Sequence, residues 1–290
     1  EMMVEIARLM ASLATYNRAI DRYEILGVMG PDEYHDAYPD AEEAGLDNNA
    51  YTNVMVAWVL SRAREAVDVV PPFRREELIE KLHLSHEELA TWDEISRKLK
   101  VPFHDDGIIS QFEGYGDLEE FDWIGYTERY GDIQRLDRIL EAEGDTPNRY
   151  KLSKQADVLM LFYLLSTEEL RSLFHQLGYE LDADAIDRNI AYYDERTSHG
   201  STLSRIVNAW VLARSDRKRS WEFFQNALLS DVEDIQGGTT PEGIHLGAMA
   251  GTVDLVQRGF TGIETREDTL VLDPVIPEEL GGRVFEIRYR

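Results

Sequence analysis

Apolar residues recur every three or four positions along most of the chain, which is the spacing of helices that bury one face. This period predicts a first helix over residues 1–26, ended by glycines, and a second over residues 49–69, closed by a pair of prolines. Ser85 and Ser166 each precede a glutamate by three positions, a capping box that marks a helix start. The further predicted helices span residues 74–83, 86–98, 154–165, 167–175, 183–193, 202–213, 217–229 and 241–258.

Three segments depart from the helical period. Residues 31–48 are polar and acidic and contain several helix breakers, so they predict a long loop, which in a compact domain is often functional. Residues 101–126 alternate glycines with aromatic residues, which indicates an irregular stretch that lines something. Residues 285–290 alternate apolar and charged side chains, the period of a β-strand. Helices joined by long loops favour a helical barrel whose loops build a pocket at one end.

The charge of the chain narrows the range of partners. With 56 acidic and 30 basic residues the net charge is −26, so the surface repels nucleic acid and anionic membranes, and phosphate needs a local group of donors. The chain has no cysteine, which excludes disulfides and thiolate zinc sites. Its longest apolar run, residues 158–165, is too short to span a membrane, and no signal peptide precedes the first helix. We therefore expect a cytoplasmic protein.

The predicted loop and the helix start after it carry a group of polar residues suited to sugar chemistry. The sequence GPDEYH at residues 30–35 and the sequence DNNAYTN at residues 47–53 supply carboxylates, an aromatic ring, an imidazole and carboxamides. Such groups bind sugar hydroxyls and donate a proton to a glycosidic oxygen. Glu33, with Tyr34 as an apolar wall beside it, is the candidate acid; the alternative is a solvated surface carboxylate.

A second segment suits an anion. Ser198, His199, Gly200 and Ser201 come immediately before the helix predicted from residue 202, and the N-terminus of a helix presents unpaired N–H donors and partial positive charge. The alternative is that Ser201 caps this helix while His199 packs beneath it. Two further candidate ligands also have structural alternatives. Lys154 is typical of a solvated cation at a helix start, and His245, between two glycines, is typical of a core histidine.

Four motifs in one order resemble a known family. They are GPDEYH with DNNAYTN, KQAD at residues 154–157, RTSHGSTLS at residues 196–204, and EGIH leading to GAMAG at residues 242–251. Together they are similar to glycoside hydrolase family 65, which includes maltose, trehalose and kojibiose phosphorylases, and the resemblance runs from residue 1 to residue 290. It implies an all-α fold class: the second half of an (α/α)6 barrel over residues 1–262, followed by the start of a C-terminal β region over residues 263–290.

The resemblance also implies roles for single residues. Glu33 matches the general acid of the family, and Lys154 and Gln155 match residues of the glucose subsite. With the loop residues, the candidate substrate ligands are Lys154, Gln155, Tyr34, His35 and Asn49. The candidate phosphate ligands are Ser198, His199, Gly200, Ser201 and His245. No metal and no cofactor are expected, because inorganic phosphate itself is the nucleophile.

The expected reaction is inverting phosphorolysis of an α-glucosidic disaccharide to β-glucose 1-phosphate and a free sugar, catalysed by a glycosyltransferase of the disaccharide phosphorylase type. One alternative is a hydrolase of the trehalase or kojibiose hydrolase type on the same scaffold. The other is a non-catalytic carbohydrate-binding fragment, because the W-D-T-E-like segment that completes the glucose subsite of the family does not occur in the sequence. The expected partners are therefore disaccharide, phosphate, an upstream part of the same protein or a complementary chain, and a second copy in a homodimer.

Overall fold

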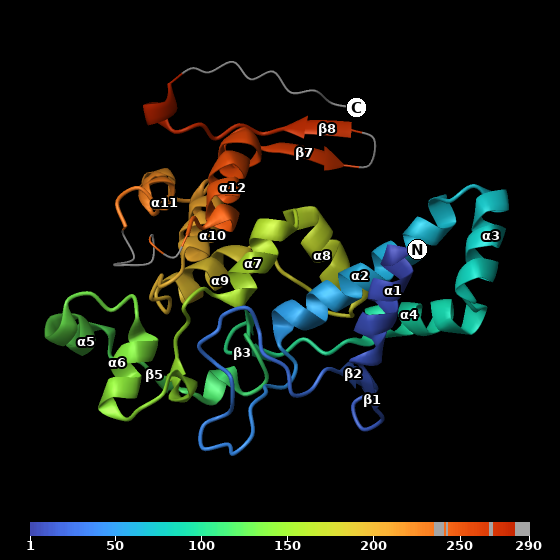
Figure 1. Cartoon of the computed structure of the whole chain (residues 1–290), viewed down its shortest axis with the longest axis horizontal. Helices are drawn as coiled ribbons and strands as arrows, with labels where there is room; N and C mark the ends of the chain where they lie inside the picture. The colour runs from blue at the N-terminus through green and yellow to red at the C-terminus, as the bar shows by residue number, and fades with distance from the viewer. Residues whose placement is uncertain (235–240, 242, 267–268, 282–290) are drawn as a thin grey trace. The chain divides into compact units, whose positions relative to one another are not determined.

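A computed structural model describes residues 1–234, 241, 243–266 and 269–281 (Figure 1). The chain forms two compact units, Glu1–Ser198 and His199–Arg290, and each is described by itself. The all-α class with a short β segment after it is confirmed, since helices dominate both units and a β-hairpin follows the last helix. Within the described ranges, no helix combines the length and the apolar character needed to cross a lipid bilayer.

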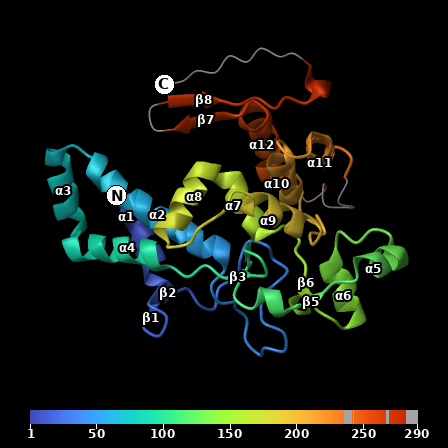
Figure 2. The same cartoon turned by 180° about the vertical axis from the view of Figure 1, so that it is seen from behind.

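Helix α2 (Ala50–Val69) is the central element of the first unit. It packs against α1, α4, α7 and α8, and both views show it between these neighbours (Figures 1 and 2). Its start follows from Asn49, whose Oδ1 accepts a hydrogen bond from the N–H of Thr52 at 2.9 Å. The other helices of the unit are α1 (Met2–Ser12), α3 (Pro72–Leu82), α4 (His86–Lys98), α5 (Trp123–Tyr130), α6 (Leu136–Glu143), α7 (Asp157–Leu164), α8 (Thr167–Gln176) and α9 (Ala185–Asp194).

Both helix starts predicted from the capping boxes are confirmed, and both serines act as N-caps. The hydroxyl of Ser85 accepts a hydrogen bond from the N–H of Glu88 at 3.0 Å, and the hydroxyl of Ser166 accepts one from the N–H of Glu169 at 3.2 Å. The helices α4 and α8 therefore begin where the sequence predicts, because each box satisfies a donor that the first turn leaves unpaired.

The first predicted helix was wrong beyond residue 12. Helix α1 ends at Ser12, and residues 15–24 form an antiparallel hairpin of β1 (Thr15–Asn17) and β2 (Arg22–Glu24). Tyr16 and Tyr23 face each other across this pair with ring centroids 5.1 Å apart, and Asp21 takes a left-handed φ of 50° in the turn. The turn and the cross-strand rings outweigh a helical spacing of apolar residues.

The aromatic stretch holds more regular structure than the sequence indicates. Residues 103–109 form a short hairpin of β3 (Phe103–His104) and β4 (Ile108–Ile109), and β5 (Glu119–Glu120) pairs in parallel with β6 (Tyr150–Lys151). Helices α5 and α6 were not predicted, and they lie side by side because Tyr126 and Tyr130 of α5 donate to Glu143 of α6. The aromatic residues of α5 continue the irregular aromatic stretch, which hides the start of this helix in the sequence.

The second unit is a small helical layer followed by β structure. Helices α10 (Thr202–Leu212), α11 (Arg217–Leu229) and α12 (Leu246–Asp254) pack on one another, and β7 (Ile263–Arg266) pairs with β8 (Thr269–Leu272). Helix α12 starts later than the predicted residue 241. The strand predicted over residues 285–290 lies outside the described residues, as does Glu242 of the EGIH motif.

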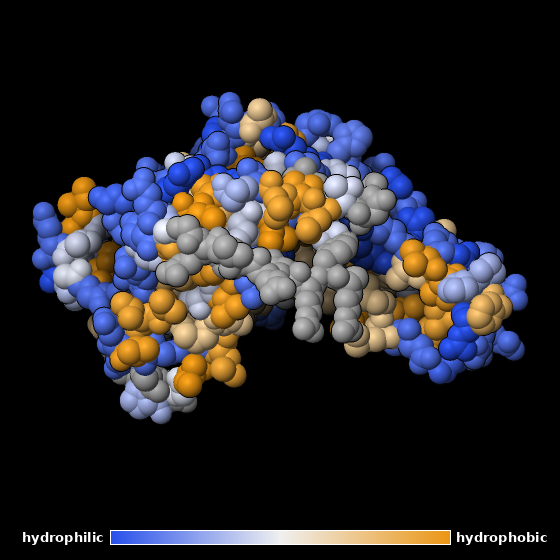
Figure 3. Space-filling model, turned by 90° about the horizontal axis from the view of Figure 1, so that it is seen from above, coloured by the Kyte–Doolittle hydropathy of each residue, from blue (hydrophilic) through white to orange (hydrophobic). Residues whose placement is uncertain are grey.

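Large apolar side chains are exposed on both units despite the high net charge. On α1, Met2 and Leu9 are 74% and 59% exposed, and on α12, Leu246 is 74% exposed. Figure 3 shows such apolar groups in orange among hydrophilic surface. Exposed apolar area of this kind is compatible with association, although the upstream partner and the homodimer stay predictions.

Candidate active site

Glu33 lies in the long loop between β2 and α2 and points to solvent. Its side chain is 64% exposed, so the predicted apolar wall around it does not form. Its Oε2 lies 2.7 Å from Nζ of Lys154, a residue 121 positions later in the chain. The backbone of Glu33 has a φ of 70°, in the left-handed region that non-glycine residues seldom adopt, and such conformations cluster at functional sites.

Asp32, next to Glu33, is buried and ties the loop to the segment before α7. Its Oδ1 accepts hydrogen bonds from the backbone N–H groups of Lys154 at 2.6 Å and Gln155 at 3.1 Å. Gln155 is bound to the same loop by its own side chain, because its Nε2 donates to the carbonyl of Pro31 at 2.8 Å. The segment that carries Lys154 is therefore fixed to the loop that carries Glu33.

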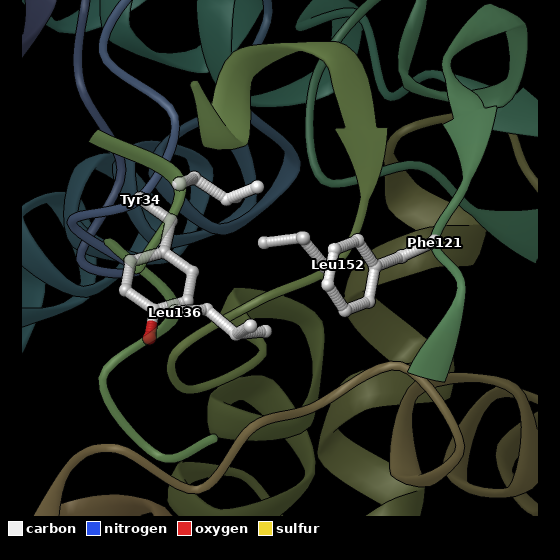
Figure 4. Packing of buried hydrophobic residues seen from close by; sticks show 5 residues of the cluster. Tyr34, Phe121, Leu136 and Leu152 are labelled. Carbon is white, nitrogen blue, oxygen red and sulfur yellow. The ribbon is translucent and has the colours of Figure 1, made fainter. Parts of the chain in front are cut away.

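Tyr34 and His35 point inward. Tyr34 packs in a cluster with Phe121, Leu136 and Leu152 (Figure 4), and its hydroxyl hydrogen-bonds to Oγ of Ser198 at 3.0 Å. Burial raises the pKa of Tyr34 to about 12, so this hydroxyl stays protonated at neutral pH. His35 is 3% exposed, and its Nε2 donates to the carbonyl of Tyr150 at 2.9 Å. Both side chains are engaged inside the protein.

A buried pair lies behind the loop. Asn49 donates from Nδ2 to Oδ2 of Asp157 at 2.8 Å, and burial, helped by the nearby charge of Asp32, raises the pKa of Asp157 well above its usual range. Gly30 packs directly on this pair, because a Cβ there would lie 2.0 Å from Oδ2 of Asp157. Glycine is required at this position by the close approach.

Ser198 joins the same assembly. Its N–H donates to the carbonyl of Ser153 at 2.9 Å, and Ser153 also forms an isolated parallel bridge with Thr197. The end of the first unit is thereby held beside the residue that precedes Lys154. Of the predicted ligands, the structure brings together Glu33, Lys154, Gln155, Tyr34, His35, Asn49 and Ser198 in one connected group of the first unit.

In the second unit, the packing alternative for the Ser-His-Gly-Ser segment is observed locally. The hydroxyl of Ser201 accepts a hydrogen bond from the N–H of Leu203 at 3.2 Å and caps α10. The ring of His199 lies 4.8 Å from that of Phe223, and its Nδ1 is 2.9 Å from Oγ of Ser204.

His245 precedes α12 rather than lying within a helix, as the sequence had suggested. Its Nδ1 lies 2.5 Å from Oδ1 of Asp231, and its N–H donates to Oδ2 of the same residue at 2.9 Å. This contact holds the pKa of Asp231 below its usual range. The imidazole is one-third exposed, with 32% of its side-chain surface accessible.

The helices that follow Ser201 and His245 start at the same place within the second unit. A Cβ on Gly247, in the first turn of α12, would lie 3.7 Å from the side chain of Leu203, in the first turn of α10. Two helix N-termini therefore lie next to each other, and the partial positive charge at each of them favours negative charge.

Sequence reasoning missed three supporting residues. Asp32 and Asp157 stand inside motifs that the sequence singles out, yet nothing in the sequence shows that their carboxyls are buried. Gln111, whose Oε1 accepts from the N–H of Asp157 at 2.8 Å, carries no sequence signal at all. Among the residues that the structure describes, no three metal-binding side chains form a metal site. Two surface cavities of the first unit, of about 650 and 300 Å³, include none of the predicted ligands.

Comparisons with known proteins agree on a family. Residues 1–254 match the family described as "Glycosyl hydrolase family 65 central catalytic domain". The chain is 56% identical over 290 residues to an uncharacterized glycosyl hydrolase of Mycobacterium tuberculosis (strain ATCC 25618 / H37Rv), covering 100% of this chain and 22% of that protein. It is 41% identical over 261 residues to trehalose 6-phosphate phosphorylase of Lactococcus lactis subsp. lactis (strain IL1403), covering 89% of this chain and 32% of that protein.

Among solved structures, "Putative kojibiose phosphorylase from human microbiome" matches with a TM-score of 0.71 and 24% identity, over 94% of this chain and 34% of that one. This likeness confirms the fold as part of the helical barrel. The chain thus spans between about a fifth and a third of the length of these proteins. The family match ends at residue 254, and the predicted domain boundary at residue 262 stays a prediction.

Proposed function

Because this chain belongs to glycosyl hydrolase family 65, we propose that its protein catalyses inverting phosphorolysis of an α-glucosidic disaccharide. In this reaction an oxygen of inorganic phosphate attacks the anomeric carbon from the face opposite the leaving sugar. The glycosidic C–O bond breaks, and the departing oxygen takes a proton from an acid. The products are β-glucose 1-phosphate and a free sugar, and no metal or cofactor takes part.

The observation that carries this proposal is the position of Glu33. Its carboxyl group is exposed at a loop whose backbone is held by buried contacts, and Lys154 occupies Oε2 at 2.7 Å. Within the described residues, no hydrogen bond to Oε1 is seen, so that oxygen is accessible to a glycosidic oxygen. An acid that is reachable from solvent yet fixed by its loop meets the geometric need of general acid catalysis.

Phosphorolysis needs one catalytic carboxyl, the acid, and no carboxylate base. A hydrolase of the inverting type needs a second carboxylate that activates water, roughly 6.5–9.5 Å from the acid. Asp32 and Asp157, the other carboxyls of the assembly, are 3% and 1% exposed and are held by protein groups. Phosphate needs no such base, since its own oxygen is the attacking group.

The adjoining N-termini of α10 and α12 support a phosphate subsite. We assign Ser198, His199, Gly200, Ser201 and His245 to it, with the N–H groups of both first turns as donors. The relative from Lactococcus lactis and the kojibiose phosphorylase of Halothermothrix orenii (strain H 168 / OCM 544 / DSM 9562), which is 30% identical over 296 residues, are phosphorylases by name. The remaining assigned ligands, Lys154, Gln155, Tyr34, His35 and Asn49, form or support the sugar subsite.

The test is a panel of α-linked glucose disaccharides, unphosphorylated and 6-phosphorylated, incubated with the complete protein with and without phosphate. Formation of β-glucose 1-phosphate that depends on phosphate supports the proposal. Release of glucose at the same rate without phosphate would establish the hydrolase alternative. Binding of sugar without turnover of any member of the panel would leave the carbohydrate-binding alternative.

A further inference from the structure

Asp32 has contacts that the proposed reaction does not yet use. It is 3% exposed, so it does not reach a substrate in solution. One of its carboxyl oxygens, Oδ1, receives two backbone N–H groups, those of Lys154 and Gln155, at 2.6 and 3.1 Å. The other, Oδ2, lies 3.2 Å from Nδ1 of His35.

His35 extends these contacts to a third segment. Its Nε2 donates to the carbonyl of Tyr150, in β6, at 2.9 Å. Its ring packs at 5.1 and 5.8 Å from the rings of Phe112 and Tyr115. Asp32 is therefore flanked on one side by a packed imidazole, while it accepts hydrogen bonds from the backbone of Lys154 and Gln155 on the other.

This geometry links Asp32 to the candidate acid in two ways, by a covalent bond and by a hydrogen bond. Glu33 follows Asp32 directly in the chain, and Lys154 is the residue whose N–H makes the shorter bond to Asp32. The side chains of these two residues then meet at 2.7 Å. A single buried carboxylate thus fixes the backbone on both sides of the Glu33–Lys154 pair, whose two residues are 121 positions apart.

We propose that Asp32 is a positioning residue for the proton donor: it places the backbone of Lys154 against the loop, so that Lys154 and Glu33 hold the orientation that protonates the leaving sugar. This inference rests on the proposed function. Charge-assisted bonds from a buried carboxylate are shorter and stronger than neutral ones. A shift of about 1 Å in a catalytic group costs about 100-fold in rate.

The test compares two glucosyl substrates that differ in their need for an acid. The sugar released from a disaccharide is a poor leaving group and needs the proton, whereas α-glucosyl fluoride releases fluoride with little assistance. In Asp32→Asn, we expect turnover of the disaccharide to fall about 100-fold, the cost of a misplaced catalytic group, and turnover of the fluoride to stay within about threefold. The control is Asp36→Asn in the same loop. The exposed carboxylate of Asp36 accepts a hydrogen bond from Nδ2 of Asn148, and its replacement should change neither rate.

A second measurement does not depend on activity. Amide hydrogen exchange at Lys154 and Gln155 should accelerate in Asp32→Asn and remain as in the wild type in Asp36→Asn and Glu33→Gln. Equal losses with both donors, or unchanged exchange at both amides, would overturn the inference. A wild-type protein that turns over no disaccharide rejects the proposed function instead, and the exchange data then show separately whether Asp32 holds this segment.

Discussion

Nζ of Lys154 lies 2.7 Å from Oε2 of Glu33, although Lys154 belongs to the segment before α7 and Glu33 to the loop before α2. The pair is largely solvated at the Glu33 end, where 64% of the side chain is exposed. Exposed ion pairs contribute about 0–1 kcal/mol to stability. The contact is therefore too weak to account for the fold and is better explained by the chemistry of the loop.

The first prediction concerns Glu33→Gln. The change is nearly isosteric and removes the proton donor together with the charge that faces Lys154, so phosphorolysis of disaccharides should fall by about 100-fold or more. The melting temperature should stay close to that of the wild type. Steady-state rates together with thermal unfolding test this, with Glu42→Gln, an exposed acidic residue of the same loop, as the control. A variant that keeps half of the wild-type rate would exclude Glu33 as the acid.

Ser201→Ala and His245→Ala should each raise the KM for phosphate more than the KM for the sugar. A hydrogen bond to a charged group contributes about 1.5–3 kcal/mol, which corresponds to roughly 10- to 100-fold. Because Ser201 also caps α10, the control is Asp216→Ala, which removes the cap of α11. That variant should lower stability without a selective effect on phosphate. Equal effects of Ser201→Ala on both substrates would indicate structural damage alone.

Asp157→Asn should make the free energy of unfolding less sensitive to rising pH. Burial holds the pKa of Asp157 far above its ordinary value near 3.8, so the folded state keeps a proton that the unfolded chain releases. The free energy of unfolding of the wild type therefore falls as pH rises above about 4, by up to about 1.4 kcal/mol per pH unit from this group.

Asparagine does not titrate, and its Oδ1 still accepts from Asn49. The difference between the free energies of unfolding of the variant and the wild type should thus grow in favour of the variant as the pH rises above about 4, until the pH passes the raised pKa of Asp157. Urea unfolding at several pH values measures it. Parallel curves for the two proteins would show that Asp157 titrates normally.

The packing of α10 on α12 yields a matched pair of glycine variants. A Cβ at Gly251 would lie 2.7 Å from Cγ2 of Ile206, so Gly251→Ala should destabilise the protein by about 1–3 kcal/mol. A Cβ at Gly247 would meet Leu203 at an ordinary 3.7 Å. Gly247→Ala should therefore be neutral or stabilising by up to about 1 kcal/mol. Denaturant unfolding of both variants measures the two changes in the free energy of unfolding. Equal changes would contradict the close approach at Gly251.

The helices could be predicted from sequence where spacing and capping agree. The starts of two helices could be predicted from Ser85 and Ser166, because the glutamate three positions later identifies the backbone N–H that each serine accepts from. The hairpin at residues 15–24 could not be predicted, because Tyr16 and Ile20 fit a helical stripe equally well and only the partner strand decides between them. Tertiary contacts override local spacing there.

The candidate site, like the fold, could be predicted from the sequence only in part. The motifs indicate Glu33 and Lys154, whose side chains meet in the structure. The sequence cannot reveal that Asp32 and Asp157 are buried, since burial depends on segments more than 100 positions away. It also cannot reveal that Tyr34 turns from Glu33 into the core, because adjacent loop residues point in directions set by backbone angles.

The left-handed backbone at Glu33 has a consequence for which substitutions this position tolerates. With a φ of 70°, the residue occupies a conformation that costs a side chain about 1 kcal/mol or more and costs glycine almost nothing. Mutation to glycine would relax the loop and remove the carboxyl group in one step. Under the proposed function, the residue that this backbone accommodates at the lowest cost is therefore one that cannot donate the proton.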